Sequence, residues 1–303
     1  MTLTPASIDF TVGSRRLLAV PRRLETVCFS LEDILAGRLP KACDRQEGDG
    51  FRVLSAPQER IGELLRHFPD HVMGGRQDYP RHYIDMSGSY EDYLGQFSGK
   101  TRSTLRRKQR KLADACDGAC RVSAHRTVAE VEDFLKAALP LSAMTYQARL
   151  LDAGLPDTPR ARERLLEQAE QDRLRCFLLR AGDTPIAYLA LPIDGQTLVY
   201  AWLGYQPEWA RLSPGTVLQM EALEQLFAEA RYRWFDFTEG DGAHKAMFGT
   251  ASVECASFVL LEKTLANRAL LGARDGFDAA VAGAKSIAER SGALARVRTL
   301  LRA

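Results

Sequence analysis

The sequence has no apolar run of the roughly 18 residues that a membrane-spanning helix needs. Its first ten residues, MTLTPASIDF, lack a basic stretch followed by an apolar core, so we expect no secretory signal. Of its six cysteines only Cys116 and Cys120 are close together, and no second Cys or His pair at zinc spacing accompanies them. We therefore expect free thiols, no metal and a cytoplasmic location.

The chain also has little excess of either charge. Its 41 basic and 39 acidic residues give a net charge of +2, which argues against nucleic-acid binding through overall charge. The composition, 46% hydrophobic and 26% charged, is typical of a folded globular chain. Its 303 residues are enough for one large or two small domains.

The expected elements alternate irregularly between strands and helices. The first 55 residues predict short strands, and Ser89 with Asp92 predicts a capped helix over 90–97, followed by a basic helix over 100–115. The rest of the pattern predicts strands at 120–124, 173–180, 185–193, 197–205, 234–237 and 253–260, and helices from 127, over 159–171 and over 216–230. This order predicts an α/β fold, layered in the α+β manner, with strands in both directions rather than a regular βαβ repeat.

The junction at Ser213-Pro214-Gly215 predicts a helix start of a particular kind. Ser213 suits an N-cap, Pro214 suits the first helical position and Gly215 leaves the backbone uncovered. Free N–H groups and the positive end of the helix dipole there would accept a phosphate. Many ordinary helices begin with Ser-Pro, so an unremarkable helix start is the alternative.

A Gly-rich loop follows the strand predicted at 234–237 and holds four titratable groups. Glu239, Asp241 or His244 could take a proton from an attacking amine. Lys245 could hold a phosphate or a developing oxyanion. A solvated acidic turn is the alternative.

The helix predicted over 100–115 has seven basic residues between Lys100 and Lys111 and no acid among them. Arg102, Arg106 and Arg110 share one of its faces. Such a density of like charge indicates an anionic partner, although a solvated face is an equal alternative. Aromatic residues for base stacking are missing, which makes nucleic acid the weakest candidate.

The order of these motifs resembles the acyltransferases of the GNAT superfamily. It is most similar to their CelD-like branch, which carries a cellulose-biosynthesis label and is related to the Fem peptidoglycan aminoacyltransferases. The resemblance runs from about residue 83 to 249. It rests on Tyr90-Glu91-Asp92-Tyr93-Leu94, Thr101-Arg102, Leu105-Arg106-Arg107-Lys108, Ile186-Ala187, Leu203-Gly204-Tyr205, Ser213-Pro214-Gly215, Phe235-Asp236-Phe237 with Gly240, and Lys245 with Phe248-Gly249.

The resemblance implies a GNAT acyl-CoA N-acyltransferase fold with two GNAT-like halves and C-terminal helices. The expected domains are a degenerate N-terminal half with the basic helix over 1–125, an acyl-CoA-binding domain over 126–262, and an amphipathic helical tail over 263–303. Sequence repetition between the halves is not visible, so the division rests on analogy with the Fem proteins.

The resemblance further implies that acyl-CoA is the co-substrate and lies between two central parallel strands. The residues expected to bind it are Trp202, Leu203, Gly204, Tyr205, Ser213, Pro214, Gly215 and Thr216, with Arg102 and Arg106 as substrate or phosphate ligands. An amine attacks the thioester directly in this family. Related sequences often have Tyr before the lysine, whereas this chain has His244, which competes with Glu239 for the role of base. Lys245 is the expected stabiliser, and Asp236 is either a structural partner or a catalyst.

We therefore expect an acyl-CoA-dependent N-acyltransferase acting on a small or carbohydrate-linked amine. An alternative is transfer of a long acyl chain to an amphiphilic, sphingoid-like or amino-lipid amine on the inner face of the membrane. This alternative rests on the tail from Thr264, a pair of amphipathic helices that bears arginines and is broken near Ser291-Gly292. The other interpretation of the tail is a helix that packs on the main domain. A non-catalytic nucleic-acid-binding module is a distant third.

Overall fold

The computed structural model describes residues 3–12, 15–39, 48–145 and 154–290. The chain divides into two compact units, Met1–Tyr79 with Glu254–Ala303, and Pro80–Val253. Two long strands belong to both units in sequence, β4 (His71–Asp85) and β11 (Ala251–Glu262). The predicted boundaries at 125 and 262, and the origin of the first unit as a GNAT-like half, stay predictions.

The first unit is built on a sheet of N-terminal strands. β1 (Leu3–Val12) pairs antiparallel with β2 (Arg15–Cys28), β2 parallel with β3 (Gly50–Pro57), and β3 antiparallel with β11. Its helices are α1 (Leu31–Leu35), a 3₁₀ turn (Gln58–Arg60), α2 (Ile61–Arg66) and the long α10 (Leu265–Arg290). Ile8, Leu24, Leu261 and Leu271 form a core between the strands and α10.

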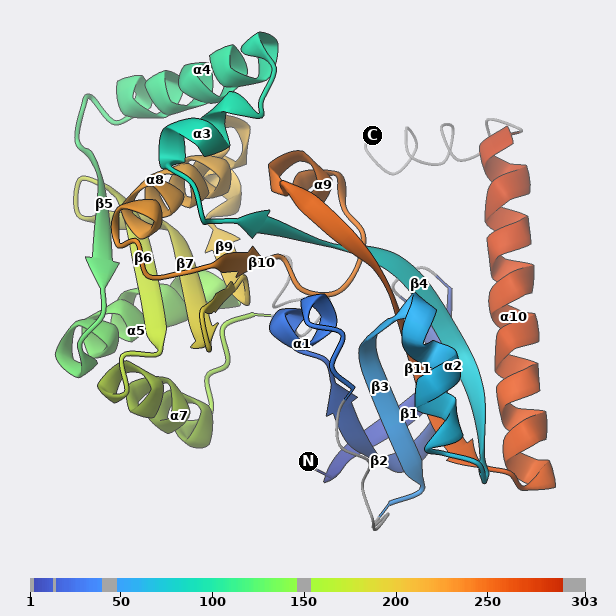
Figure 1. Ribbon diagram of the computed structural model, residues 1–303. Helices are drawn as coiled ribbons and strands as arrows, with labels where there is room; N and C mark the ends of the chain where they lie inside the picture. Colours follow the sequence, from blue (N-terminus) through green and yellow to red (C-terminus); the bar gives the residue numbers. More distant parts are fainter. Residues whose placement is uncertain (1–2, 13–14, 40–47, 146–153, 291–303) are drawn as a thin grey trace. The chain divides into compact units, whose positions relative to one another are not determined.

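The second unit has a mixed sheet with helices on both faces (Figure 1). Its strands run in the order β4, β10 (Trp234–Asp236), β8 (Thr197–Val199), β7 (Thr184–Asp194), β6 (Leu174–Ala181) and β5 (Cys120–His125), while β9 (Trp202–Tyr205) pairs with β7. The pairing of β10 with β8 is parallel and the others are antiparallel. Its helices are α3 (Tyr90–Gly95), α4 (Gly99–Ala115), α5 (Val128–Ala143), α7 (Pro159–Glu170), α8 (Pro214–Ala228) and α9 (Ala243–Phe248), with a 3₁₀ helix at Pro207–Leu212.

Alternation along β6 explains the layers of this unit. Cys176 and Leu178 join a core with α5 and α7, whereas Phe177 and Leu179 join a second core with α3, α4 and α8. Both faces of β6 are therefore buried, which requires helices on both sides. The predicted α/β fold with strands in both directions is confirmed.

The structure confirms some local predictions and corrects others. The capped helix after Ser89 is confirmed, since its Oγ accepts from the Asp92 amide at 3.1 Å and the Asp92 carboxylate accepts from the Ser89 amide at 3.0 Å. The single strand predicted at 197–205 is wrong, because the chain breaks into β8 and β9. The loop predicted after 237 contains α9. The tail is one helix through residue 290, and its predicted second part lies outside the described residues.

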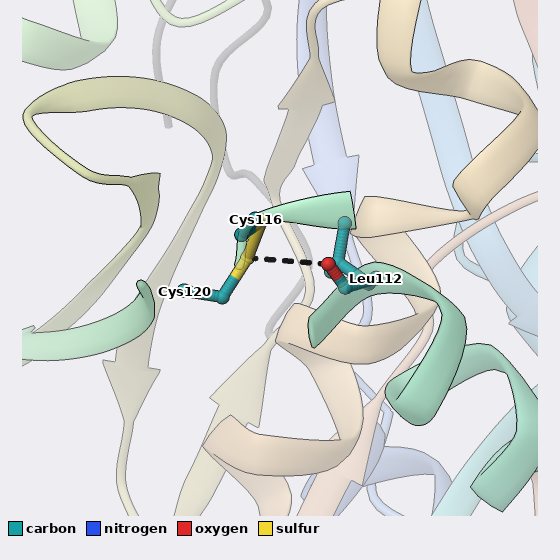
Figure 2. The surroundings of a disulfide bond; sticks show 3 residues. All are labelled: Leu112, Cys116 and Cys120. Atoms are coloured by element: carbon teal, nitrogen blue, oxygen red, sulfur yellow. Dashed lines mark hydrogen bonds between the residues drawn. A yellow bond between two sulfur atoms is a disulfide. The ribbon is translucent and has the colours of Figure 1, made fainter. Parts of the chain in front are cut away.

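The prediction of free thiols is wrong for Cys116 and Cys120, which form a disulfide (Figure 2). Asp117 and Gly118 have positive φ values of 49° and 75°, and this left-handed turn reverses the chain between α4 and β5. The two Cα atoms therefore lie 5.6 Å apart, within the range a disulfide spans. The Cys120 sulfur also lies 3.7 Å from the Leu112 carbonyl oxygen, so the bond sits against the last turns of α4.

No helix within the described ranges combines the length and the hydropathy that crossing a bilayer requires.

Candidate active site

The two central strands of the second unit separate at residue 200. β8 pairs with β10 from Thr197 opposite Trp234 to Val199 opposite Asp236, and the Tyr200 amide then donates to the Asp236 carbonyl oxygen at 2.9 Å. Beyond this bond, β9 continues along β7 and, among the described strands, pairs with no other. The result is a fork between β9 and β10, with Tyr200 at its apex.

Two glycines let bulky side chains pack around β9. Gly204 is paired with Tyr188 of β7, and a Cβ at Gly204 would lie 2.4 Å from an atom of the Tyr188 ring. Gly215, in the first turn of α8, lies against β9, where an added Cβ would meet the Leu203 side chain at 2.9 Å and that of Tyr205 at 3.2 Å. The first turn of α8 therefore sits directly on the strand that forms one arm of the fork.

The prediction that Ser213 caps this helix is wrong. Ser213 has φ 55° and ψ 48°, and its side chain makes no capping hydrogen bond. A capping side chain reaches the first-turn amides from an extended backbone, whereas Ser213 leads directly from the 3₁₀ helix at Pro207–Leu212 into α8 with a left-handed turn. Pro214 does occupy the first helical position, as predicted.

The ring of His244 lies against aromatic side chains at the fork. Its centroid is 6.2 Å from that of Tyr200, 6.3 Å from that of Phe237 and 4.7 Å from that of Phe248. The Tyr200 hydroxyl is 3.5 Å from Nε2 of His244. Burial raises the pKa of that hydroxyl, so Tyr200 stays protonated. Because Tyr200 also marks the apex, these contacts place the imidazole where β9 and β10 part.

The same imidazole nitrogen contacts a buried amide. Nε2 of His244 lies 2.7 Å from Oε1 of Gln219, a side chain of α8 that is fully buried. Partial burial lowers the pKa of His244 from its ordinary value, and the cations Lys108 of α4 and Lys245 of α9 lower it further. The ring is therefore neutral at neutral pH, the form that a general base requires.

Lys245 points to the other side of α9. Its Nζ donates to the carbonyl oxygen of Glu239. Burial lowers the pKa of Lys245, while the carboxylates of Asp236, Glu239 and Asp241 oppose that shift. The Glu239 side chain is exposed on the loop. A cation held over a loop at the fork can stabilise developing negative charge.

The Asp236 carboxylate is held by a buried arginine. Arg81 of β4 donates from Nε to Oδ1 at 3.0 Å and from a terminal nitrogen to Oδ2 at 2.5 Å, and the Thr238 amide donates to Oδ1 at 2.9 Å. Both side chains of the ion pair are almost fully buried. Thr238 has φ 62°, so the chain turns sharply here, after β10. The pair thus fixes the start of the loop that leads to α9.

Arg102 and Arg106 lie outside this cluster. They line a cavity of about 360 Å³ formed with Tyr90 and Glu91 of α3 and with Met220 and Glu224 of α8. Within the described part of the chain, neither arginine forms an ion pair at 4 Å or less. Their charges are therefore available to an anion.

Sequence reasoning missed three residues of this site: Arg81, Tyr200 and Gln219. Tyr200 sits within a predicted strand, and neither Tyr200 nor Arg81 carries a local motif. Gln219 carried a weak signal, since it is a polar residue on a largely apolar stretch of the helix predicted over 216–230.

Comparison with known proteins finds a matching domain and a similar fold. The model of the acetyltransferase (GNAT) domain matches residues 99–246, which include α4, the fork and His244. No curated protein sequence matches the chain. The crystal structure of FemX superposes with a TM-score of 0.51 at 10% identity, covering 84% of this chain and 88% of that one. This likeness shows the fold alone.

Two further structures cover somewhat less. A conserved protein of unknown function from Bacteroides thetaiotaomicron VPI-5482 gives a TM-score of 0.48 at 12% identity, covering 76% of this chain and 72% of that one. The C-terminal domain of a putative lysylphosphatidylglycerol synthetase from Agrobacterium fabrum gives 0.47 at 14% identity, covering 75% and 72%.

The second unit thus contains a GNAT acetyltransferase domain, and its fold is GNAT-like. The chain is a transferase of the acyltransferase class, as predicted. GNAT domains use acyl-CoA as their co-substrate, and the acceptor they acylate is generally an amine.

Proposed function

We propose that this chain transfers the acyl group of an acyl-CoA to an amine by direct attack, with His244 as the general base. The observation that carries the proposal is the position of His244, whose ring contacts Tyr200 at the apex of the β9–β10 fork. A fork between parallel strands offers unpaired backbone groups of Trp202–Tyr205 to a thioester. The first turn of α8, from Pro214 to Thr216, would bind the pyrophosphate of the acyl-CoA.

The proposed reaction needs two proton movements. His244 takes a proton from the ammonium of the acceptor, and the amine then forms a C–N bond with the thioester carbonyl carbon. The C–S bond breaks, and the second proton, lost from the nitrogen as the amide forms, passes to the leaving thiolate to give the thiol of CoA. Lys245 stabilises the negative charge that develops on oxygen or sulfur. In this proposal Asp236 is a positioning residue, because its carboxylate is occupied by Arg81 and the Thr238 amide.

Steady-state kinetics of His244→Ala and Lys245→Ala test these roles. We expect kcat to fall about 10²- to 10⁴-fold, the usual contribution of a general base, with little change in the KM for acyl-CoA. Lys136→Ala, on the exposed surface of α5, is the matched control for the lysine. If His244→Ala keeps its full rate across neutral pH, Glu239 becomes the base.

The length of the acyl chain and the acceptor class form the finer part of the proposal. A thermal-shift titration with CoA, acetyl-CoA and palmitoyl-CoA separates them, since a ligand that binds the folded state raises the melting temperature. A preference for acetyl-CoA supports a small or carbohydrate-linked amine. A preference for palmitoyl-CoA supports an amphiphilic amine at a membrane surface. No shift with any of them refutes the acyl-CoA proposal.

The arginines of α4 belong to the same proposal. We propose that Arg102 and Arg106 bind a phosphate group of the donor or of the acceptor, because they face a cavity without a carboxylate partner close enough to pair.

A further inference from the structure

Gln219 is buried without satisfying all of its polar atoms. Gln219 is 0% exposed, and its amide nitrogen Nε2 has no hydrogen-bond partner in the part of the chain that the structure describes. A buried donor without an acceptor destabilises a fold, and an apolar side chain of similar size would avoid that cost. The only side-chain partner found for Gln219 is His244, at 2.7 Å among the described residues. These facts indicate a role for Gln219 at the imidazole rather than in the core.

The contact also specifies which imidazole nitrogen carries hydrogen. The Gln219 atom facing His244 is the carbonyl oxygen Oε1, which can only accept. Nε2 of His244 must therefore donate, and the lone pair of the neutral ring lies on Nδ1. No described residue is found within hydrogen-bond distance of Nδ1, so this atom is free to accept a proton from a substrate.

The groups around the ring support the same assignment. The charges of Lys108 in α4 and Lys245 in α9 lower the pKa of the ring, and the Tyr200 hydroxyl lies 3.5 Å from Nε2. The two cations disfavour a second proton on the ring. When His244 is transiently protonated, Nε2 still donates to Gln219, so the ring keeps one orientation in both states.

We infer that Gln219 is a positioning residue that holds His244 as its Nε2–H tautomer, with Nδ1 as the atom that takes the proton. This inference rests on the proposed function for its kinetic consequence, but the tautomer itself does not depend on that function. Gln219 touches neither reactant in this scheme and acts only through His244.

The first test is spectroscopic and needs no substrate. Two-bond ¹H–¹⁵N correlation spectra of the ¹⁵N-histidine-labelled chain distinguish a protonated ring nitrogen from one with a lone pair. We expect the neutral ring of His244 to show hydrogen on Nε2 in the wild type. In Gln219→Leu we expect both tautomers and a changed titration midpoint. Hydrogen on Nδ1 in the wild type, or identical spectra in Gln219→Leu, would overturn the inference.

The second test separates orientation from stability. Gln219→Leu should lower kcat about 10- to 100-fold, the scale of a small misplacement of a reacting group, while KM changes little. Its melting temperature should stay equal or rise, because an unsatisfied buried amide is removed. Gln225→Leu, the same change at an exposed position of α8, should alter neither quantity.

A double-mutant cycle completes the design. If Gln219 acts through His244, Gln219→Leu in the His244→Ala background should cause no further loss of kcat. Gln219→Glu should move the acid limb of the pH–rate profile upward, since a carboxylate favours the imidazolium. Additive losses in the cycle would overturn the inference. Absence of any acyl transfer with the expected tautomer intact would instead refute the proposed function.

Discussion

The buried pair of Arg81 and Asp236 gives the sharpest stability prediction. Their side chains are 6% and 1% exposed, and two hydrogen bonds of 3.0 and 2.5 Å join them. Asp236→Asn keeps the size of the side chain but removes its charge and turns an NH₂ group toward the guanidinium or the Thr238 amide. Breaking one partner of a buried ion pair typically costs about 3–5 kcal/mol. We therefore expect a loss of that size.

Urea unfolding followed by tryptophan fluorescence measures this loss, because Trp234 precedes Phe235 and Asp236 in the same strand. A loss of about 4 kcal/mol corresponds to a melting temperature lower by roughly 8–16 °C for a unit of this size. Asp133→Asn is the matched control. Its carboxylate pairs with Lys136 at 2.8 Å, but both side chains are largely exposed, so we expect no measurable change.

A double variant tests whether the loss of stability comes from the buried charge that is left without a partner. Replacing both members by apolar residues, as in Arg81→Met with Asp236→Leu, should recover much of the stability, because no buried charge is then left. If Asp236→Asn costs no more than Asp133→Asn, the pair does not fix the loop after β10 and the reasoning is wrong.

Two further variants test the electrostatics of His244 and the start of α8. Lys108→Gln should raise the pKa of His244 and so move the acid limb of the kcat/KM profile to higher pH, whereas Lys111→Gln, one turn apart and exposed, should leave the profile in place. Gly215→Ala should weaken CoA binding in a calorimetric titration because its Cβ would press on β9, whereas Gly99→Ala, in the first turn of α4 with open space around it, should not. An unmoved limb, or equal affinities, would contradict the respective assignment.

The elements of the second unit could be predicted from the sequence where the signal is local. The cap at Ser89, the proline at the first position of α8 and the alternation of β6 all act within a few residues. The break between β8 and β9 could not be predicted in this way. Tyr200 and Ala201 interrupt no apolar pattern, and the separation appears only when β10 bonds to one strand and not to the other.

The disulfide shows a similar limit. The spacing of Cys116 and Cys120 is visible in the sequence, but whether two such residues meet depends on the turn between them. Asp117 and Gly118, both with positive φ, determine that turn. Of the two, only Gly118 is a residue type that predicts a positive φ from the sequence. A short Cys spacing next to Asp-Gly is therefore a better indication of a disulfide than the spacing alone.

The site depends on the short helix α9, where the sequence predicted a loop, and on two neighbours that sequence reasoning missed, Gln219 and Tyr200. Consecutive residues on a helix point about 100° apart, so α9 sends His244 toward Gln219 and Tyr200 and sends Lys245 toward the Glu239 carbonyl. One short helix thereby separates a neutral base from a cation although they are adjacent in sequence. The charge of Lys245 lowers the pKa of His244, which helps to keep the imidazole neutral. The His244-Lys245 pair can be recognised in the sequence as a candidate base and cation. The residues that orient the two side chains are brought to them only by the fold.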